Sequence, residues 1–548
     1  MSTSPNHRHI NLFIALIGVA LLVLAIRFGV LMLKRFQSDK RYEDPVVADR
    51  VVRGTIYDRN GRILAIQTPY WGVYFHLNKI KDLKLVSEVV APFVQMSPGE
   101  IIERTKAYTT YARISSRIDE DQVEPLLAAL SKYNLLDSVN VEKRIGRTYP
   151  SLFHAAQILG FTNAEGEGIE GLEYALEKQL NPYPKVGEEQ ITYGSDVYLT
   201  LDMDIQYALD VQLQEIANLY DPNIIMGIIM DAKTGDILAL GSYPWYDPNA
   251  FSRSNPRQRT NNTISTLLEP GSVFKLFSLA SVLKAGEAKL DESFECTGSY
   301  SFQAGNSTVT INCSTAHGTV DPQMMIAKSC NGAIAHWARQ TDEEAFYQTL
   351  VDLGFTRSWD IGLPSRPRAQ IADPSTWSAR SEATIAFGQE LLATSLHLAT
   401  AATALGIDGD LLQPHLILRI IDASTGTIVK QREKEVVAHL FDQADTALIR
   451  KGMHKATSDE GTGYKARVND FEIGIKTGTA QLFNPEKNSY SDGSTLASSL
   501  ALAPIEDPAY IIYIGVEGGR GWGADLAAPG IGNLVQALIS QGKLRKTR

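Results

Sequence analysis

Three short motifs constrain this chain more than any other feature of its sequence. They are Ser272-Val-Phe-Lys275, Ser329-Cys-Asn331 and Lys476-Thr-Gly-Thr479. Ser272 follows a Glu-Pro-Gly turn and precedes a run that is apolar on nearly every face, which predicts a buried helix beginning at the serine. Lys476 follows Phe471-Glu-Ile-Gly-Ile475, which predicts a strand. A hydroxyl and an amine at a buried helix start, combined with a Lys-Thr-Gly strand, indicate acyl-transfer chemistry.

Length and composition limit the possible classes of protein. A chain of 548 residues suggests two or three domains. With 44% hydrophobic and 21% charged residues, it has enough apolar side chains for a sizeable core. The net charge of −10 and the absence of a basic face argue against nucleic acid as a partner. The basic run at residues 543–548 is interpreted as a solvated tail.

An apolar stretch near the N-terminus predicts a membrane anchor. Residues 10–26 would span roughly 25 Å as a helix, and continuation to Leu33 would give roughly 36 Å, which exceeds the ~30 Å of a hydrocarbon core. No small-x-small cleavage site follows, so a retained anchor at residues 10–33 is favoured over a removed signal peptide. Residues 1–9 are then a cytoplasmic tail. Basic residues after the span favour the opposite orientation by charge count, but the chemistry of the motifs places the remaining chain outside the cytoplasm.

The pattern along the chain predicts an α+β fold. Tight-turn signals predict hairpins at Asp58-Arg-Asn-Gly61 and Lys233-Thr-Gly235. Asp202 is a predicted helix N-cap. Further predicted elements are a helix carrying Val123, Leu126, Leu127 and Leu130, strands at 495–503 and 510–516, and a closing helix at 530–540. Strands at both ends with helices between them predict an antiparallel sheet flanked by helices.

The cysteines and histidines give no clear cofactor signal. Cys296 and Cys313 flank a predicted Gly-rich hairpin, and a disulfide and two packed thiols are both compatible with this spacing. A catalytic role for Cys330 is not favoured, because no histidine partner is adjacent in the sequence. Three histidines fall in no recognised metal-ligand spacing and are interpreted as structural or exposed: His154, His317 and His336. The sequence therefore predicts no metal and no cofactor.

Together, these motifs make the chain resemble a class B penicillin-binding protein, a monofunctional peptidoglycan D,D-transpeptidase. Additional matching elements are Arg53-Gly-Thr-Ile-Tyr-Asp-Arg-Asn-Gly61, Arg147-Thr-Tyr-Pro150, Leu199-Thr-Leu-Asp202, Asp231-Ala-Lys-Thr-Gly-Asp236 and Asp247-Pro-Asn249. The resemblance covers nearly the whole chain. It implies an elongated pedestal module at residues 50–195 and a transpeptidase domain at 196–548. The absence of a Glu-Asp-centred glycosyltransferase motif argues against the bifunctional class A type.

The resemblance also implies roles for the motif residues. Ser272 is the expected nucleophile, and Lys275, one helical turn away, is the expected base. Ser329 would relay a proton to the leaving amine, and Asn331 would bind the substrate amide. The third motif would hold the substrate carboxylate and backbone through Lys476, Thr477, Gly478 and Thr479. The backbone N–H groups of Ser272 and Thr479 are the expected oxyanion hole.

The function implied is that of a membrane-anchored enzyme in the bacterial cytoplasmic membrane. It would crosslink stem peptides ending in D-Ala-D-Ala and be acylated by β-lactams. The alternatives are a D,D-carboxypeptidase or β-lactamase, and a β-lactam sensor or idle scaffold. Glu269-Pro-Gly-Ser272, the Ser-Cys-Asn motif and the compact length resemble the septal type more than the elongation type. In the septal role, the expected partners are a multi-pass glycan polymerase and other division proteins.

Overall fold

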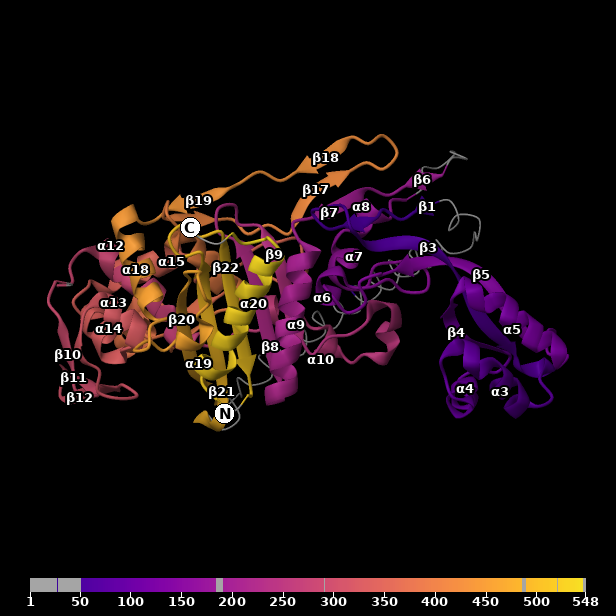
Figure 1. Ribbon diagram of the computed structural model, residues 1–548, viewed down its shortest axis with the longest axis horizontal. Helices are drawn as coiled ribbons and strands as arrows, with labels where there is room; N and C mark the ends of the chain where they lie inside the picture. The colour runs from indigo at the N-terminus through magenta and orange to yellow at the C-terminus, as the bar shows by residue number, and fades with distance from the viewer. Residues whose placement is uncertain are drawn as a thin grey trace, which may run out of the picture. The chain divides into compact units, whose positions relative to one another are not determined.

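The computed structural model describes Arg27 and residues 51–183, 191–289, 291–484, 489–519 and 521–545 (Figure 1). Apart from Arg27, the predicted tail and anchor at residues 1–33 lie outside these ranges. No helix within the described ranges is both long and apolar enough to cross a membrane. The chain divides into two compact units, 1–52 with 182–193 and 53–181 with 194–548. In the first unit, β1 (Val51–Val52) pairs in parallel with β6 (Thr192–Tyr193).

The second unit begins with a module built on one long strand. β3 (Ile63–His76) pairs antiparallel with β4 (Tyr111–Ile118) and β5 (Val139–Thr148). Three helices, α3 (Leu83–Val94), α4 (Pro98–Thr105) and α5 (Glu120–Lys132), share a buried apolar core with these strands. The predicted helix around residue 126 is confirmed as α5, although Leu127 lies on its exposed side. The strands β4 and β5 were not predicted from the sequence.

The predicted turn at Asp58 is confirmed. The side chain of Asp58 accepts hydrogen bonds from the N–H groups of Asn60 (2.9 Å) and Arg62 (2.8 Å), which closes the hairpin between β2 (Ile56–Tyr57) and β3. β2 also pairs in parallel with β7 (Asp196–Leu199), and β7 pairs with β17 (Ile417–Ile421), the neighbour of β18 (Ile428–Gln431). A seven-stranded sheet therefore joins the module built on β3 to the rest of the second unit.

Two of the sequence motifs meet at a single buried carboxylate, that of Glu173 in α7 (Gly171–Ala175). Arg53 Nε lies 2.7 Å from Glu173 Oε2, and Arg147 Nε lies 2.6 Å from Glu173 Oε1. Glu173 is fully buried, and both arginine side chains are nearly so. Each arginine also donates to a backbone carbonyl, Arg53 to Glu173 O and Arg147 to Gly54 O. The hydrogen-bonded ion cluster thus fixes to each other three segments of the second unit that are distant in the sequence.

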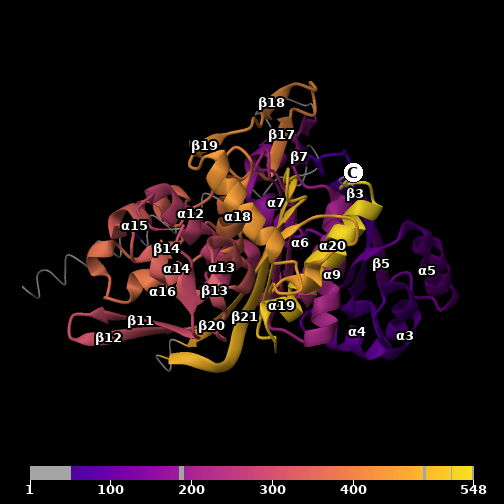
Figure 2. The same cartoon turned by 60° about the vertical axis from the view of Figure 1, so that its left-hand side comes forward.

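The predicted antiparallel sheet is also confirmed. It contains β8 (Ile224–Asp231), β9 (Ile237–Tyr243), β20 (Gly474–Asn484), β21 (Ser489–Ala503) and β22 (Tyr510–Glu517), in the order β20-β21-β22-β8-β9. Alternate side chains enter opposite cores. Ile225 and Ile229 pack with α9 (Met203–Tyr220) and α20 (Ala528–Ser540), two helices that lie side by side (Figures 1 and 2).

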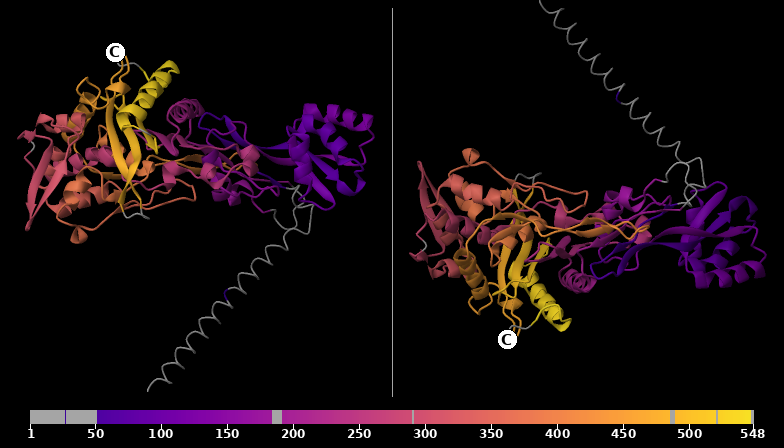
Figure 3. Two further views of the ribbon diagram at one scale, coloured as in Figure 1. Left: turned by 90° about the horizontal axis from the view of Figure 1, so that it is seen from below. Right: turned by 90° about the horizontal axis from the view of Figure 1, so that it is seen from above.

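On the other side of this sheet, Ile228 and Met230 join the core of a group of helices. The group comprises α12 (Lys275–Ala285), α13 (Pro322–Lys328), α14 (Asn331–Ala338), α15 (Glu343–Asp352), α16 (Ser381–Ala386), α17 (Ser395–Ala401) and α18 (Gln443–Lys455). The predicted Gly-rich hairpin is confirmed as β11 (Ser299–Ala304) and β12 (Ser307–Asn312), framed by the pair β10 (Phe294–Cys296) and β13 (Gly318–Val320). This pink segment lies at the outer edge of the helices (Figure 3).

Candidate active site

Ser272 lies in a tight turn that is held against the strand carrying the third motif. It belongs to the 3-10 helix η4 (Gly271–Phe274), which continues into α12 as predicted. Gly271 has φ +58° and donates its N–H to Gly388 O at 2.9 Å. A Cβ at Gly388 would lie 2.0 Å from Gly271 O, and one at Gly271 would lie 2.9 Å from Thr479 O. Glycine at both positions therefore permits the approach that sets the place of Ser272.

Lys275 is completely buried, and its amine contacts the second motif. Nζ donates to Ser329 O at 2.6 Å and lies 3.0 Å from Ser329 Oγ. Burial lowers the pKa of Lys275 to about 8, and negative charge on Cys330 and Cys313 offsets part of this effect. An amine that loses its proton near neutral pH suits general-base catalysis. The structure thus places the two predicted groups, Lys275 and Ser329, in direct contact.

The second motif joins the ends of two helices. Ser329 ends α13 in the left-handed conformation, with φ +59°, which is uncommon for a residue with a side chain. Cys330 is the N-cap of α14, and its sulfur accepts the N–H of Ala333 at 3.4 Å. Asn331 begins α14 and donates its side-chain amide to Asn312 O at 2.8 Å. The abrupt change of direction presents the hydroxyl of Ser329 to Lys275.

The third motif lies on β20, as predicted. Lys476 is fully buried and donates to Thr477 O at 2.7 Å. Its pKa lies well below the ordinary lysine value, because burial and then the charge of Lys275 disfavour the ammonium form. A bound anion would favour that ammonium form again. A Cβ at Gly478 would lie 2.9 Å from Val273 Cγ2, so glycine lets the turn that carries the serine pack directly on the strand.

Two residues outside the predicted set support the threonines of the third motif. Thr477 Oγ1 donates to Thr462 Oγ1 at 2.6 Å, and the N–H of Gly523 donates to Thr479 Oγ1 at 3.1 Å. Thr462 lies in the loop between α18 and β20, and Gly523 begins α19 (Gly523–Leu526). Neither residue was identified from the sequence. Glycines on both sides of Thr462, at 461 and 463, were the only local sign of a constrained loop.

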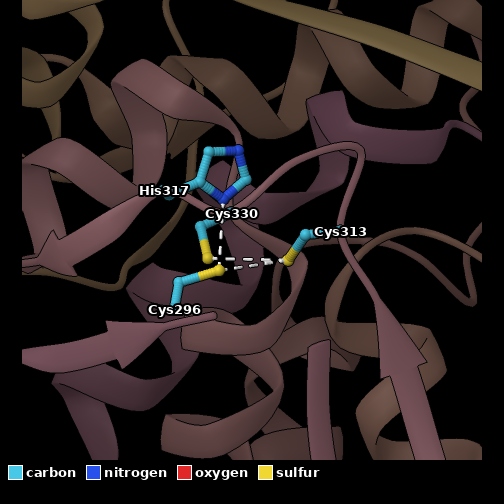
Figure 4. A group of neighbouring side chains, drawn as sticks. All are labelled: Cys296, Cys313, His317 and Cys330. Atoms are coloured by element: carbon cyan, nitrogen blue, oxygen red, sulfur yellow. Dashed lines mark hydrogen bonds between the residues drawn. The ribbon is translucent and has the colours of Figure 1, made fainter. Parts of the chain in front are cut away.

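A cluster of three cysteines and one histidine includes the middle residue of the second motif (Figure 4). It consists of Cys296, Cys313, His317 and Cys330, whose possible ligand atoms all lie within 4.8 Å of one another. The three cysteines are free thiols. The proposed pair Cys296 and Cys313 is close, with 3.7 Å between the sulfur atoms, but Cys330 is equally close to Cys313 at 3.8 Å. Sequence spacing did not indicate that His317 belongs with these cysteines.

The other two histidines singled out in the sequence have structural partners. His154 Nδ1 lies 2.7 Å from Asp210 Oδ2, and His336 Nε2 lies 2.9 Å from Gln340 Nε2. Burial lowers the pKa of His336, which favours the neutral ring. These contacts agree with the interpretation of both residues as structural.

Comparisons with known proteins match both parts of the chain. Residues 225–536 match the family described as penicillin binding protein transpeptidase domain, and residues 48–195 match the penicillin-binding protein dimerisation domain. The chain is 28% identical over 495 residues to the probable peptidoglycan D,D-transpeptidase PenA of Neisseria gonorrhoeae, covering 85% of this chain and 80% of that protein. It is 25% identical over 520 residues to the stage V sporulation protein D of Bacillus subtilis, covering 89% and 78%.

A solved structure supports the fold. Penicillin binding protein 3 of Mycobacterium tuberculosis, in complex with ampicillin, is similar with a TM-score of 0.71 and 24% identity. The similarity covers 90% of this chain and 96% of that protein. The arrangement of an N-terminal module and a mixed α and β domain is therefore one that has been observed experimentally.

Proposed function

The chain belongs to the class B penicillin-binding proteins, a family of serine-type D,D-transpeptidases, and we propose that it crosslinks peptidoglycan through an acyl-enzyme on Ser272. The observation that carries the proposal is the buried amine of Lys275, which has a pKa of about 8 and lies one helical turn from the serine. It contacts Ser329 directly. This arrangement supplies a nucleophile, a base and a proton relay within one site.

In the proposed acylation step, Lys275 acts on Ser272. Lys275 takes the proton of Ser272, whose Oγ attacks the carbonyl carbon between the two D-Ala residues of the stem peptide. The N–H groups of Ser272 and Thr479 stabilise the negative charge on the carbonyl oxygen. When the C–N bond breaks, the terminal D-Ala leaves with a proton delivered through Ser329, and an ester on Ser272 remains.

The second half-reaction returns the enzyme to its starting state. The amine of another stem peptide attacks the ester and loses a proton to the site, and Ser272 regains its hydroxyl proton. In this proposal Asn331 binds the donor's amide, and Lys476, Thr477 and Thr479 bind the terminal carboxylate, while Gly478 leaves room for the peptide along β20. A β-lactam opens on Ser272 in the same way, but its leaving amine stays attached to the acyl group.

Labelling with a fluorescent penicillin tests the nucleophile. We expect wild-type protein to be labelled covalently and Ser272→Ala to lose all label. Ser281→Ala is the matched control, because Ser281 lies on the continuing helix and its hydroxyl donates only to Phe277 O. Stoichiometric label on folded Ser272→Ala would refute the assignment. Reaction of the acyl-enzyme with a stem-peptide amine, rather than with water, distinguishes a transpeptidase from a carboxypeptidase.

The proposal includes an anchor at residues 10–33, with the catalytic domain on the outer side of the cytoplasmic membrane. Its support is the apolar run in the sequence and the location of the proposed substrate. Protease added to intact spheroplasts should digest the chain beyond about residue 35 and spare the anchor. Protection of the C-terminal domain would reverse the topology.

The proposed cellular role is septal wall synthesis. Glu269-Pro-Gly-Ser272 before the catalytic helix and the Ser-Cys-Asn form of the second motif support this choice over elongation. In that role the anchor helix packs against a multi-pass glycan polymerase that supplies the strands to be crosslinked. Depletion in the host should block septation while side-wall growth continues. Widened or rounded cells that still divide would instead identify an elongation enzyme.

A further inference from the structure

We propose that Cys296, Cys313, His317 and Cys330 bind a zinc ion that fixes the second motif in position. These residues come from three separate places in the fold. Cys296 ends β10, Cys313 and His317 lie in the segment between β12 and β13, and Cys330 is the N-cap of α14. Their side chains point toward one another in Figure 4. Three thiols and one imidazole form one of the usual ligand sets of structural zinc sites.

The distances fit tetrahedral coordination. Zinc–sulfur bonds of about 2.3 Å in a tetrahedron place two sulfur atoms about 3.8 Å apart. Cys296 Sγ and Cys313 Sγ are separated by 3.7 Å, and Cys313 Sγ and Cys330 Sγ by 3.8 Å. His317 Nδ1 lies 3.4 Å from Cys296 Sγ, close to the slightly shorter separation expected for one nitrogen and one sulfur ligand. These three distances are therefore those expected between ligands of one tetrahedral metal ion.

The surroundings also suit thiolate ligands. Backbone N–H groups at the start of α14 point at two of the sulfur atoms: Gly332 N–H donates to Cys313 Sγ at 3.3 Å, and Ala333 N–H donates to Cys330 Sγ at 3.4 Å. Such hydrogen bonds orient ligands and stabilise their negative charge. Cys296 and Cys330 are buried, with at most 1% of their surface exposed. With four protein ligands, the site would have no open coordination position, as is usual for structural zinc sites.

The consequence for catalysis follows from the covalent neighbours of Cys330. Ser329 precedes it and Asn331 follows it, so a metal bond to Cys330 fixes the backbone of both motif residues. The same ion would tie this backbone to the β10–β13 pair. Asn312, whose carbonyl accepts the Asn331 amide, directly precedes Cys313. The zinc ion would therefore act as a positioning group and would not touch the substrate.

Metal content of the full chain, purified without chelators, tests the site. After loading with Zn²⁺ and desalting, we expect about one zinc per chain. In competition with a chelator, the His317→Ala and Cys313→Ser variants should each retain at least about fivefold less zinc than the wild-type chain. His439→Ala is the matched control, because this histidine is exposed and pairs with Asp410. A wild-type chain without stoichiometric zinc, or with a Cys296–Cys313 disulfide in its peptide map, would overturn the proposal.

Cobalt supplies a measurement that does not depend on how well the variants fold. Co²⁺-loaded wild-type protein should show the thiolate-to-metal charge-transfer absorption and tetrahedral ligand-field bands expected of a Cys₃His site. A spectrum typical of octahedral oxygen ligands would overturn the assignment.

The positioning role has a separate readout, which rests on the proposed function. Chelator-stripped protein should be acylated by penicillin about tenfold more slowly than zinc-loaded protein, with recovery after Zn²⁺ is returned. Equal rates would refute the positioning role. If zinc-loaded wild-type protein bound stoichiometric metal but was never acylated, the proposed function would fail and the metal site would stand.

Discussion

Lys275 Nζ contacts both the backbone carbonyl and the side-chain hydroxyl of Ser329, at 2.6 and 3.0 Å. The amine of Lys275, the proposed base, is therefore positioned by the second motif. The carbonyl contact is the shorter of the two and does not depend on the side chain. In this geometry, the carbonyl of Ser329 can place the amine, and its hydroxyl can relay a proton. The sequence motifs alone do not distinguish these two roles.

The first prediction uses this separation. Lys275→Ala removes the proposed base, and we expect acylation by a fluorescent penicillin to slow by about 10³-fold, within the range for general-base catalysis. Ser329→Ala keeps the carbonyl that holds Lys275, so its loss should be smaller, about 10- to 100-fold. Lys284→Ala, a change in the last turn of the same helix, should leave the rate within about twofold. Equal losses for Lys275→Ala and Ser329→Ala would mean that the hydroxyl, not the carbonyl, positions the amine.

The second prediction concerns pH. The pKa of Lys275 is lowered to about 8 by burial, and only the neutral amine accepts the serine proton. The acylation rate constant should therefore rise with pH between 6 and 8 and level off above about 9. Lys476, Cys313, Cys330 and His317 are titratable groups that interact with this amine. In Lys275→Ala, the residual acylation rate should no longer show this rise with pH. A wild-type rate that falls as pH rises from 6 to 8 would contradict the role of base.

The third prediction tests the close approach that places Ser272. An alanine Cβ at Gly388 would meet Gly271 O at 2.0 Å, so Gly388→Ala must displace the turn before Ser272, the proposed nucleophile. We expect a lower melting temperature and acylation slowed by more than about tenfold. Gly286→Ala is the control for backbone strain alone, because Gly286 also has positive φ but an alanine Cβ there would have no atom within 4 Å. It should cost about 1–2 kcal/mol of stability and leave the acylation rate unchanged.

The parts of the fold with strong local signals were predictable. The turn at Asp58, the helix cap at Asp202 and the helix that begins at Ser272 each depend on residues close together in the sequence. The strands β4 and β5 were missed because charged residues interrupt their apolar positions: Arg113 in β4 is partly buried, and Lys143 and Arg144 in β5 are exposed. Pairing with the long strand β3 stabilises them, and such non-local pairing leaves little trace in a short window.

The candidate site shows the same limit. The motif residues were found because their types and order are distinctive. The support of Thr477 by Thr462, and the approach of His317 to three cysteines, depend on which loops the fold brings together. A single threonine or histidine carries no sign of its spatial neighbours. For the same reason, the sequence did not show that Arg53 and Arg147 share one carboxylate.

The last prediction concerns that carboxylate. Glu173 is fully buried between Arg53 and Arg147, and Glu173→Gln would leave two guanidinium groups without its negative charge. Removing one partner from a buried ionic cluster costs about 3–5 kcal/mol, so the melting temperature should fall and proteolysis of the N-terminal module should accelerate. Glu170→Gln is the matched control, since Glu170 pairs with Arg259 at 2.9 Å but is 35% exposed, and partly exposed pairs contribute about 0–1 kcal/mol. Below the unfolding temperature, both variants should be acylated by penicillin within about twofold of the wild-type rate, because neither carboxylate belongs to the proposed catalytic groups. A Glu173→Gln protein as stable as Glu170→Gln would show that the two arginines are adequately held by their remaining partners, which are the carboxylate of Glu177 for Arg53 and the carbonyls Glu173 O and Gly54 O.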